Sequence, residues 1–279
     1  MQILLTNDDG IRAPGIAAMH RALVDPSGTC GGPLAESVFT VAPLTVQSAT
    51  GHGVTFHIPL MVGKHSIECP DNTMEGLSVD GRPADCVKLA IANLWPERYG
   101  ERAKPDLAIS GLNDGANCGI NVIYSGTVAA ALEAAFLGVP SIAVSLQRGR
   151  SPSRFDVAAA WARRAINVLL KDGLPSPHEC LSINIPLCEG DGRSIDDAMP
   201  PIKICPMNVH GLVDKYERRT SPGGDVYYWA AGHGLDFHAT ERGTDVDELV
   251  RGCITLTPLS YDLTRRDMWN KWAERLRKA

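Results

Sequence analysis

The 279-residue sequence has no strongly basic segment, no long uncharged apolar run and no closely paired cysteines. Its formal net charge is −5, and lysine and arginine are scattered along it, which argues against a nucleic-acid-binding surface. Its longest apolar stretch is broken by Glu133, Gly138 and Pro140, so it falls short of the roughly 18 uncharged residues that a membrane span needs. We therefore expect neither a nucleic-acid partner nor a membrane segment.

Signals for export and for disulfide bonding are also missing. The first residues enter an apolar strand pattern directly, without a basic region and an apolar leader, so we expect no signal peptide. The eight cysteines include no CxxC pair and no histidine at zinc-ligand spacing, and Cys86 and Cys253 lie in apolar stretches. Reduced thiols in a cytoplasmic protein are the better interpretation.

What the sequence does contain is a regular alternation of strand and helix patterns over its first two thirds. Apolar strands that alternate with helices of this length predict an α/β fold, a Rossmann-like and mostly parallel sheet sandwiched by helices. The expected strands are 2–6, 37–43, 106–110, 141–146 and 181–186, the expected helices are 13–25, 82–95, 126–138 and 155–173, and 51–80 is expected to insert further β structure.

The pattern changes after Pro186, where a polar, Gly/Pro-rich connection begins. Beyond it, 202–206, 225–230 and 253–259 resemble antiparallel strands, and 262–279 has the spacing of an amphipathic helix. We divide the chain into a core with the catalytic site (1–190) and a C-terminal arm of β strands and a helix (191–279), which is expected to serve oligomerisation.

Three polar segments follow expected strands. They are NDDG (7–10), PLTVQSATGHG (43–53) and SGLNDGANCGINVIYSGT (110–127). In an open parallel sheet, ligands bind outside the carboxyl ends of the strands. If these strands are parallel, the three segments converge on one edge of the sheet.

Two adjacent carboxylates, Asp8 and Asp9, stand at the end of the first strand. Side by side they raise each other's pKa unless a cation lies between them. Oxygen ligands from Asp, Asn and Ser suit Mg²⁺ or Mn²⁺ rather than Zn²⁺, and Asn113 is the residue we place on the same ion. A solvated Asp-Gly turn is the simpler interpretation of DDG alone. The other two loops favour the metal site.

The segment that begins at Ser125 predicts a helix with an anion-binding start. Ser125 is a good N-cap, and Gly126 lets a ligand approach the free amides of the first turn. A plain N-cap is the alternative. A metal site and an anion site on one edge together predict phosphate-ester hydrolysis. The catalytic candidates are Asp8, Asp9 and Asn113, and the substrate-binding candidates are Ser48, Asn113, Asn117, Ser125, Gly126 and Thr127.

The role of His52 is left open. It could protonate the leaving alkoxide as a general acid, but a histidine in a glycine-rich loop is more often structural or solvated. Direct attack on phosphorus by Asp8, which would give an aspartyl-phosphate, is likewise left open.

Four segments resemble the SurE family of stationary-phase survival proteins, which are metal-dependent 5'/3'-nucleotidases. They are ILLTNDDGIRAPGI (3–16), PADCVKLAI (83–91), PDLAISGLNDGANCGINVIYSGTVAAALEA (105–134) and GTDVDELVRGCITLTPL (243–259). The resemblance implies one divalent cation per subunit on Asp8, Asp9, Ser48 and Asn113. It also implies a Rossmann-like core, a C-terminal arm exchanged within homodimers or homotetramers, and nucleoside monophosphates as substrates, with polyphosphate in some cases.

Three other functions were weighed against this one. A phospho-acceptor receiver module needs a lone Asp after its third strand and a Lys after its fifth, and neither is present. A haloacid-dehalogenase-type phosphatase needs an acid two residues beyond its nucleophile, where this chain has Gly10 or Ile11. A metal- and nucleotide-binding protein without turnover stays as the alternative.

Overall fold

The computed structural model describes residues 1–69, 72–190, 192–211, 213, 215–231, 235 and 237–278. The strands are β1 (Gln2–Thr6), β2 (Ser37–Pro43), β3 (Val62–Cys69), β4 (Asn72–Val79), β5 (Leu107–Asp114), β6 (Ser141–Leu146), β7 (Cys180–Ile185), β8 (Ile202–Ile204), β9 (Lys215–Thr220), β10 (Val226–Ala231) and β11 (Ile254–Leu259). The helices are α1 (Pro14–Val24), α2 (Pro83–Leu89), α3 (Trp95–Tyr99), α4 (Gly126–Phe136), α5 (Phe155–Leu169), α6 (Asp245–Val250) and α7 (Trp269–Arg277), with a π turn η1 (Ala90–Leu94) and 3₁₀ turns η2 (Gly119–Tyr124) and η3 (Arg266–Met268).

Within the described residues, one nine-stranded sheet forms the body of the molecule, in the order β3-β4-β2-β1-β5-β6-β7-β11-β8. The six strands from β4 to β7 in this order are parallel to their neighbours. β3 is antiparallel to β4, and β11 is antiparallel to β7. The α/β class and the mostly parallel sheet predicted from the sequence are confirmed.

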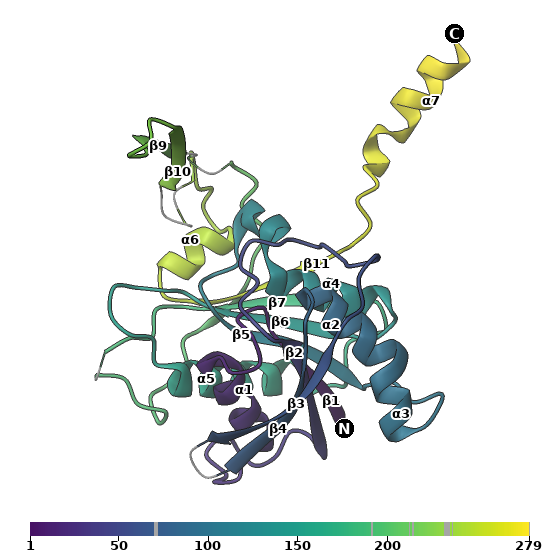
Figure 1. Ribbon diagram of the computed structural model, residues 1–279, viewed down its shortest axis with the longest axis vertical. Coiled ribbons are helices and arrows are strands. Elements are labelled where there is room, and N and C mark those ends of the chain that lie inside the picture. Colours follow the sequence, from purple (N-terminus) through teal and green to yellow (C-terminus); the bar gives the residue numbers. More distant parts are fainter. Residues whose placement is uncertain are drawn as a thin grey trace.

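Helices cover both faces of this sheet. α1 and α5 pack over one face around Met19 and Trp161, and α2 and α4 pack over the other around Val87 and Ala130. In Figure 1, α1 and α5 lie on one side of the central strands and α2 and α4 on the other. Because both faces are covered, β1 and β6 are buried on both sides, which explains why their sequences are apolar at nearly every position.

α4 is an example of how local sequence sets an element. Its N-cap, Ser125, accepts a hydrogen bond on Oγ from the Val128 N–H at 3.0 Å. The alanine-rich interior packs closely on β5 and β6. Gly138, with φ of 84°, allows the left-handed turn that follows the helix end.

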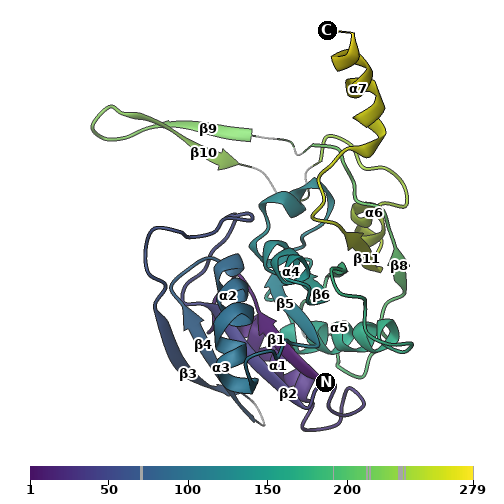
Figure 2. The same ribbon diagram turned by 90° about the vertical axis from the view of Figure 1, so that its right-hand side faces the viewer.

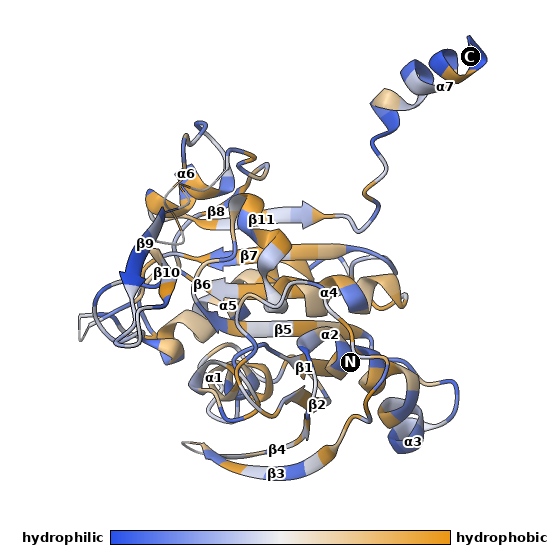
Figure 3. Ribbon diagram, turned by 45° about the horizontal axis from the view of Figure 1, so that its top comes forward, coloured by the Kyte–Doolittle hydropathy of each residue, from blue (hydrophilic) through white to orange (hydrophobic). Residues whose placement is uncertain are grey.

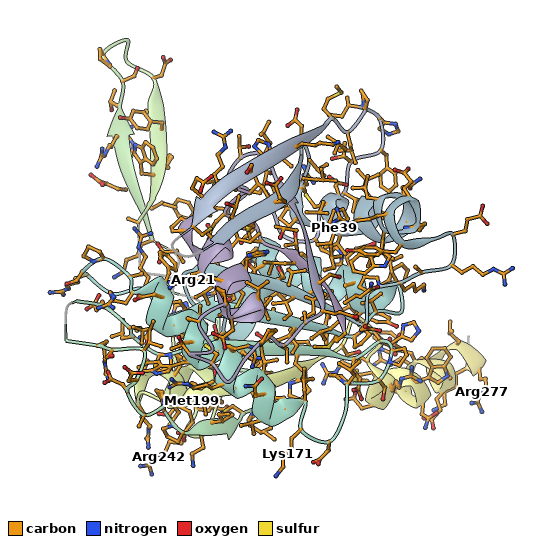
Figure 4. The ribbon with its side chains drawn as sticks, turned by 90° about the horizontal axis from the view of Figure 1, so that it is seen from below. Arg21, Phe39, Lys171, Met199, Arg242 and Arg277 are labelled. Carbon is orange, nitrogen blue, oxygen red and sulfur yellow. The ribbon has the colours of Figure 1, made fainter. Side chains whose placement is uncertain are left out.

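The C-terminal part of the chain leaves large apolar side chains exposed. β9 and β10 form a separate antiparallel hairpin, and α7 ends the chain. Figures 1 and 2 show both segments extending away from the sheet, and Figure 4 shows Arg277 of α7 at the margin of the molecule. Trp229 is 59% exposed and Trp269 is 68% exposed. In Figure 3, hydrophobic and hydrophilic segments alternate along α7.

Several element predictions were wrong in detail. The strand at 202–206 is β8, which runs parallel to β11, because the hairpin and α6 between them form a crossover connection. The strand at 225–230 pairs with β9, which the sequence pattern did not indicate. The expected helix 82–95 is interrupted by η1, and the α-helix expected over 262–279 begins only at Trp269. In the described residues, no helix is long and apolar enough to cross a membrane.

Candidate functional site

The candidate site lies where the chain reverses its direction of travel across the sheet. β1 lies between β2 and β5, and the connections from β1 to β2 and from β5 to β6 run over opposite faces through α1 and α4. Such a switch point opens a crevice at the carboxyl ends of the two central strands. Asp8 and Asp9 lie in the turn that follows β1, and Asn113 lies near the end of β5. The sheet therefore brings two of the predicted polar segments to the same edge.

The turn that carries the two carboxylates is held by its own side chains. Asn7 donates from Nδ2 to the Gly10 carbonyl at 2.9 Å, and the Gly10 N–H donates to Asn7 Oδ1 at 3.2 Å. Gly10 has φ of 98°, a conformation that favours glycine. Sequence reasoning missed Asn7, although an Asn three residues before a Gly is a recognisable turn signal.

Asp8 is almost completely buried, with 6% of its surface exposed. The Thr127 hydroxyl donates to Asp8 Oδ1, and a Cβ added at Gly126 would lie 2.9 Å from Oδ2. Burial raises the pKa of Asp8 to about 6, and the charge of Asp9 adds to this, while the bond from Thr127 opposes it. The carboxylate is thus pressed against the first turn of α4.

Asp9 lies beside Asp114, at the end of β5. Burial raises its pKa, against the opposing effect of the Asp114 N–H, which donates to Asp9 Oδ2 at 3.1 Å. Asp114 adds a third carboxylate, which accepts from Ser153 Oγ at 2.8 Å and lies 3.8 Å from Arg148 Nε. Both raised pKa values mean that the two predicted ligands are acids without enough positive charge around them.

Ser48 belongs to the loop between β2 and β3 that reaches the same edge. The Gln47 N–H donates to the carbonyl oxygen of Asp8 at 2.8 Å, and Ser48 is the next residue, with an exposed side chain. Farther along, the Gly51 N–H donates to the Tyr124 carbonyl at 3.0 Å. The loop is therefore attached both to the aspartate turn and to the segment before α4.

Asn113 and Asn117 have different surroundings. Asn113 lies on β5 itself, which runs four residues beyond the expected strand end, and its Nδ2 donates to the Gly115 carbonyl at 2.7 Å. The donor being engaged, Oδ1 is the atom that can serve as a ligand. Asn117 donates from Nδ2 to Ser145 Oγ at 2.8 Å, so its side chain anchors the loop to β6. Its contact with substrate stays a prediction.

His52 is paired with a side chain of α4, and no bond from it to Asp8 or Asp9 is seen among the described residues. Its Nε2 lies 2.8 Å from Oε2 of Glu133, whose other oxygen accepts from Lys88 Nζ at 2.9 Å. Glu133 is buried, and although burial would raise its pKa, these two partners bring the pKa below its ordinary value. Glu133 lies two helical turns beyond Gly126.

The residues that could hold a divalent cation are an oxygen-only set. The part of the chain that the structure describes contains no group of three or more His, Cys, Asp and Glu side chains arranged for a metal. The predicted set is of another kind, with two carboxylates, the Ser48 hydroxyl and the Asn113 amide oxygen. These are hard oxygen donors, and two of them are acids of raised pKa. They fit Mg²⁺ or Mn²⁺ and not a metal that prefers cysteine or histidine ligands.

Sequence reasoning also missed residues that hold this site from a distance. Asn184 of β7 accepts on Oδ1 from the Asn117 N–H at 2.8 Å and returns a bond from Nδ2 to the Asn117 carbonyl at 3.1 Å. Asp245 of α6 accepts from the Gly119 N–H at 2.7 Å. Nothing in the spacing of these residues indicates such pairings, because each joins positions far apart in the sequence.

The family model, the similar sequences and the similar solved structure that match this chain all carry the same family name. The matching family model is described as "Survival protein SurE" and covers residues 3–210. A protein of Rhodopirellula baltica named 5'-nucleotidase SurE is 42% identical over 268 residues, which is 96% of each chain. One of the same name from Heliobacterium modesticaldum is 41% identical over 95% of this chain and 88% of its own. The crystal structure of the Sure protein from Aquifex aeolicus superposes with a TM-score of 0.73 at 32% identity, covering 98% of this chain and all of that one.

Proposed function

The chain belongs to the SurE family, as its sequence first indicated, and we propose that it is a divalent-metal-dependent phosphomonoesterase that hydrolyses nucleoside monophosphates to nucleoside and phosphate. Nucleotidase is the activity named for relatives at about 40% identity over nearly their full length. The observation that carries the proposal is the pair Asp8 and Asp9 at the switch point of the sheet, with the buried Asp8 set against the first turn of α4.

The cation would be held by Asp8, Asp9, Ser48 and Asn113, and we propose Mg²⁺ or Mn²⁺, one per subunit. Such an ion, when bound, polarises a phosphoryl oxygen and lowers the pKa of a water molecule. The raised pKa of Asp8 supports this assignment, because a buried acid of this kind gains most when positive charge is placed beside it.

The chain's own residues orient and stabilise the reacting groups. Thr127 fixes the direction of the Asp8 carboxylate, and Ser125 caps α4, whose positive dipole end lies against Asp8. We place the charge on the phosphoryl oxygens at the helix start formed by Gly126 and Thr127, with the Gly126 amide as the donor, because the Thr127 N–H already donates to Asp8. Asn113 and Asn117 are proposed to complete the substrate contacts.

The C-terminal arm (191–279) is proposed to join subunits into a homodimer or homotetramer in the cytoplasm. Supporting this, Tyr228 and Trp229 of the hairpin and Trp269 and Trp272 of α7 are each more than half exposed in the single chain. Exposed aromatic side chains of this number are typical of surfaces that another protein covers. Sedimentation of the full chain and of a chain shortened before α7 measures the number of subunits in each particle. If removing α7 leaves that number unchanged, the proposed role of the arm in assembly is rejected.

The activity is tested by phosphate release from a panel of 5'- and 3'-nucleoside monophosphates and polyphosphate, with Mg²⁺, Mn²⁺ or a chelator. We expect release that requires a metal, with the panel giving base, position and polyphosphate preference. If no nucleotide is hydrolysed with any metal, the proposal is wrong. Calorimetric binding of nucleotide without turnover would support the alternative, a metal- and nucleotide-binding protein that is not an enzyme.

A further inference from the structure

A buried carboxylate in the C-terminal segment binds the middle of the loop that runs from Asn113 to the start of α4. This segment, which we call the loop 113–125, includes the last two residues of β5 and the 3₁₀ turn η2 and ends at the cap of α4. Asp245, the first residue of α6, is 2% exposed. Its Oδ2 accepts from the Gly119 N–H at 2.7 Å, and its Oδ1 accepts from the Asn208 N–H at 2.8 Å and the Val246 N–H at 2.9 Å.

The environment of Gly119 shows how closely the loop fits this contact. Its φ is 59°, and a Cβ added there would lie 2.7 Å from the Phe237 ring and 3.1 Å from the Asn208 carbonyl oxygen. Phe237 packs in the same small apolar cluster as Cys118 and Val246. The backbone at Gly119 is therefore enclosed by segments that all come from beyond residue 200.

The other anchor of the loop comes from the strands of the core. Asn117 is held by Asn184 of β7 and Ser145 of β6. Two residues later, Asp245 holds Gly119 from the opposite end of the sequence. A buried carboxylate that accepts three N–H bonds is a strong and directional anchor, and it leaves uncompensated groups when it is lost.

We propose that Asp245 is a positioning residue for the phosphatase reaction, setting the loop 113–125 so that Asn113 and Thr127 meet Asp8 in the geometry that binds the cation. This inference rests on the proposed function. It gives the C-terminal segment a role inside the subunit's own active site, in addition to the proposed assembly of subunits. Residues that orient ligands in this way typically alter metal affinity or activity by about 10- to 100-fold when they are replaced.

The test compares Asp245→Asn with Asp247→Asn. The amide is the size of the carboxylate but puts an NH₂ group against one of the donors. Asp247 lies on the same short helix, accepts from the Gly243 N–H at 2.9 Å and from Arg251, and makes no recorded contact with the loop within the described residues. For each variant, Mn²⁺ affinity is measured by calorimetry, amide hydrogen exchange over 113–127 by mass spectrometry, and kcat and KM with a nucleoside monophosphate.

For Asp245→Asn we expect faster exchange confined to 113–127, weaker Mn²⁺ binding and a kcat lower by about tenfold or more, with wild-type values for Asp247→Asn. Wild-type exchange and Mn²⁺ affinity in folded Asp245→Asn would overturn the proposal. If Asp245→Asn does not fold, Gly119→Ala decides, because its methyl group pushes the loop off the same anchor without changing the carboxylate. Should the wild type bind Mn²⁺ but release no phosphate, the proposed function fails, while exchange and metal affinity still test the positioning role.

Discussion

The Thr127 hydroxyl donates a hydrogen bond to Oδ1 of Asp8, across 119 positions of the sequence. One partner lies in the turn that follows β1 and the other lies in the first turn of α4. The bond therefore joins the proposed metal ligand to the proposed anion-binding helix start. It also lowers the pKa of Asp8 and so opposes part of the rise in pKa that burial causes.

Replacing Thr127 with Val removes this bond and keeps the side-chain shape. We expect Thr127→Val to lower kcat by about 10- to 100-fold, because the Asp8 carboxylate loses the donor that orients it. Phosphate release with saturating Mn²⁺ measures the effect. Thr127→Ser, which keeps the hydroxyl, is the control and should retain most of the activity. Equal kcat for Val and Thr would show that the bond has no part in turnover.

Asp9 and Asp114 are neighbouring carboxylates with different proposed roles, Asp9 as a metal ligand and Asp114 as a partner of Ser153 and Arg148. We expect Asp9→Asn to weaken Mn²⁺ binding and lower activity by about 100-fold or more, because a ligand charge is lost. Asp114 accepts from Ser153 and lies near Arg148, so Asp114→Asn should have a much smaller effect. Calorimetry with Mn²⁺ on both variants checks this. Similar losses in the two would contradict the ligand assignment.

The parts of the fold that local patterns encode could be predicted from the sequence. The apolar runs 2–6 and 141–146 predict strands that are buried on both faces, and Ser125 and Gly138 mark the two ends of α4. Once the strands were expected to be parallel, the sheet edge followed, and with it the convergence of Asp8 and Asn113.

What could not be predicted depends on pairings between distant segments. The direction of β8 depends on the path of the chain through the hairpin and α6, which hydropathy does not encode. The bonds from Thr127 to Asp8 and from Gly119 to Asp245 join polar residues whose own neighbours give no sign of a partner. His52 shows the same limit, because only the fold brings it to Glu133.

His20 lies outside the proposed metal site and makes the stability of the fold depend on pH. Burial lowers its pKa to about 4 from an ordinary 6.5. The unfolded chain therefore takes up a proton at His20 as the pH falls below 6.5, whereas the folded chain does so only near pH 4. Stability is lost as the pH falls through this window, by up to about 3 kcal/mol from this group.

We expect His20→Gln to reduce the slope of unfolding free energy against pH within that window. Urea unfolding at a series of pH values, with chelator present, measures it. His57→Gln is the matched control, since His57 is exposed and should leave the slope unchanged. A slope in His20→Gln equal to that of the wild type would mean that the buried imidazole is not what couples stability to pH.

Gly15 is required where α1 meets the strand that carries Asn113. A Cβ at this position would lie 1.9 Å from the Leu112 carbonyl oxygen, so the helix or the strand must move to accept alanine. We expect Gly15→Ala to destabilise the fold by about 1–3 kcal/mol, despite the better helix propensity of alanine. Urea unfolding measures the loss. Gly192→Ala, where the space is open, is the control; an equal stability change in the two would remove the steric explanation.

The role of His52 is decided by comparing two leaving groups. A general acid matters for the alkoxide of a nucleotide and little for p-nitrophenolate, which leaves without protonation. Because His52 is paired with Glu133 on the second turn of α4, we expect His52→Gln to change both turnover rates by the same small factor, about threefold or less. Lys88→Met, which removes the other partner of Glu133, should behave alike if both residues only fasten the loop and α2 to α4. A His52→Gln variant that turns over p-nitrophenyl phosphate normally but loses nucleotide hydrolysis would instead make His52 the general acid, and its ring would then have to leave Glu133 to reach the leaving oxygen.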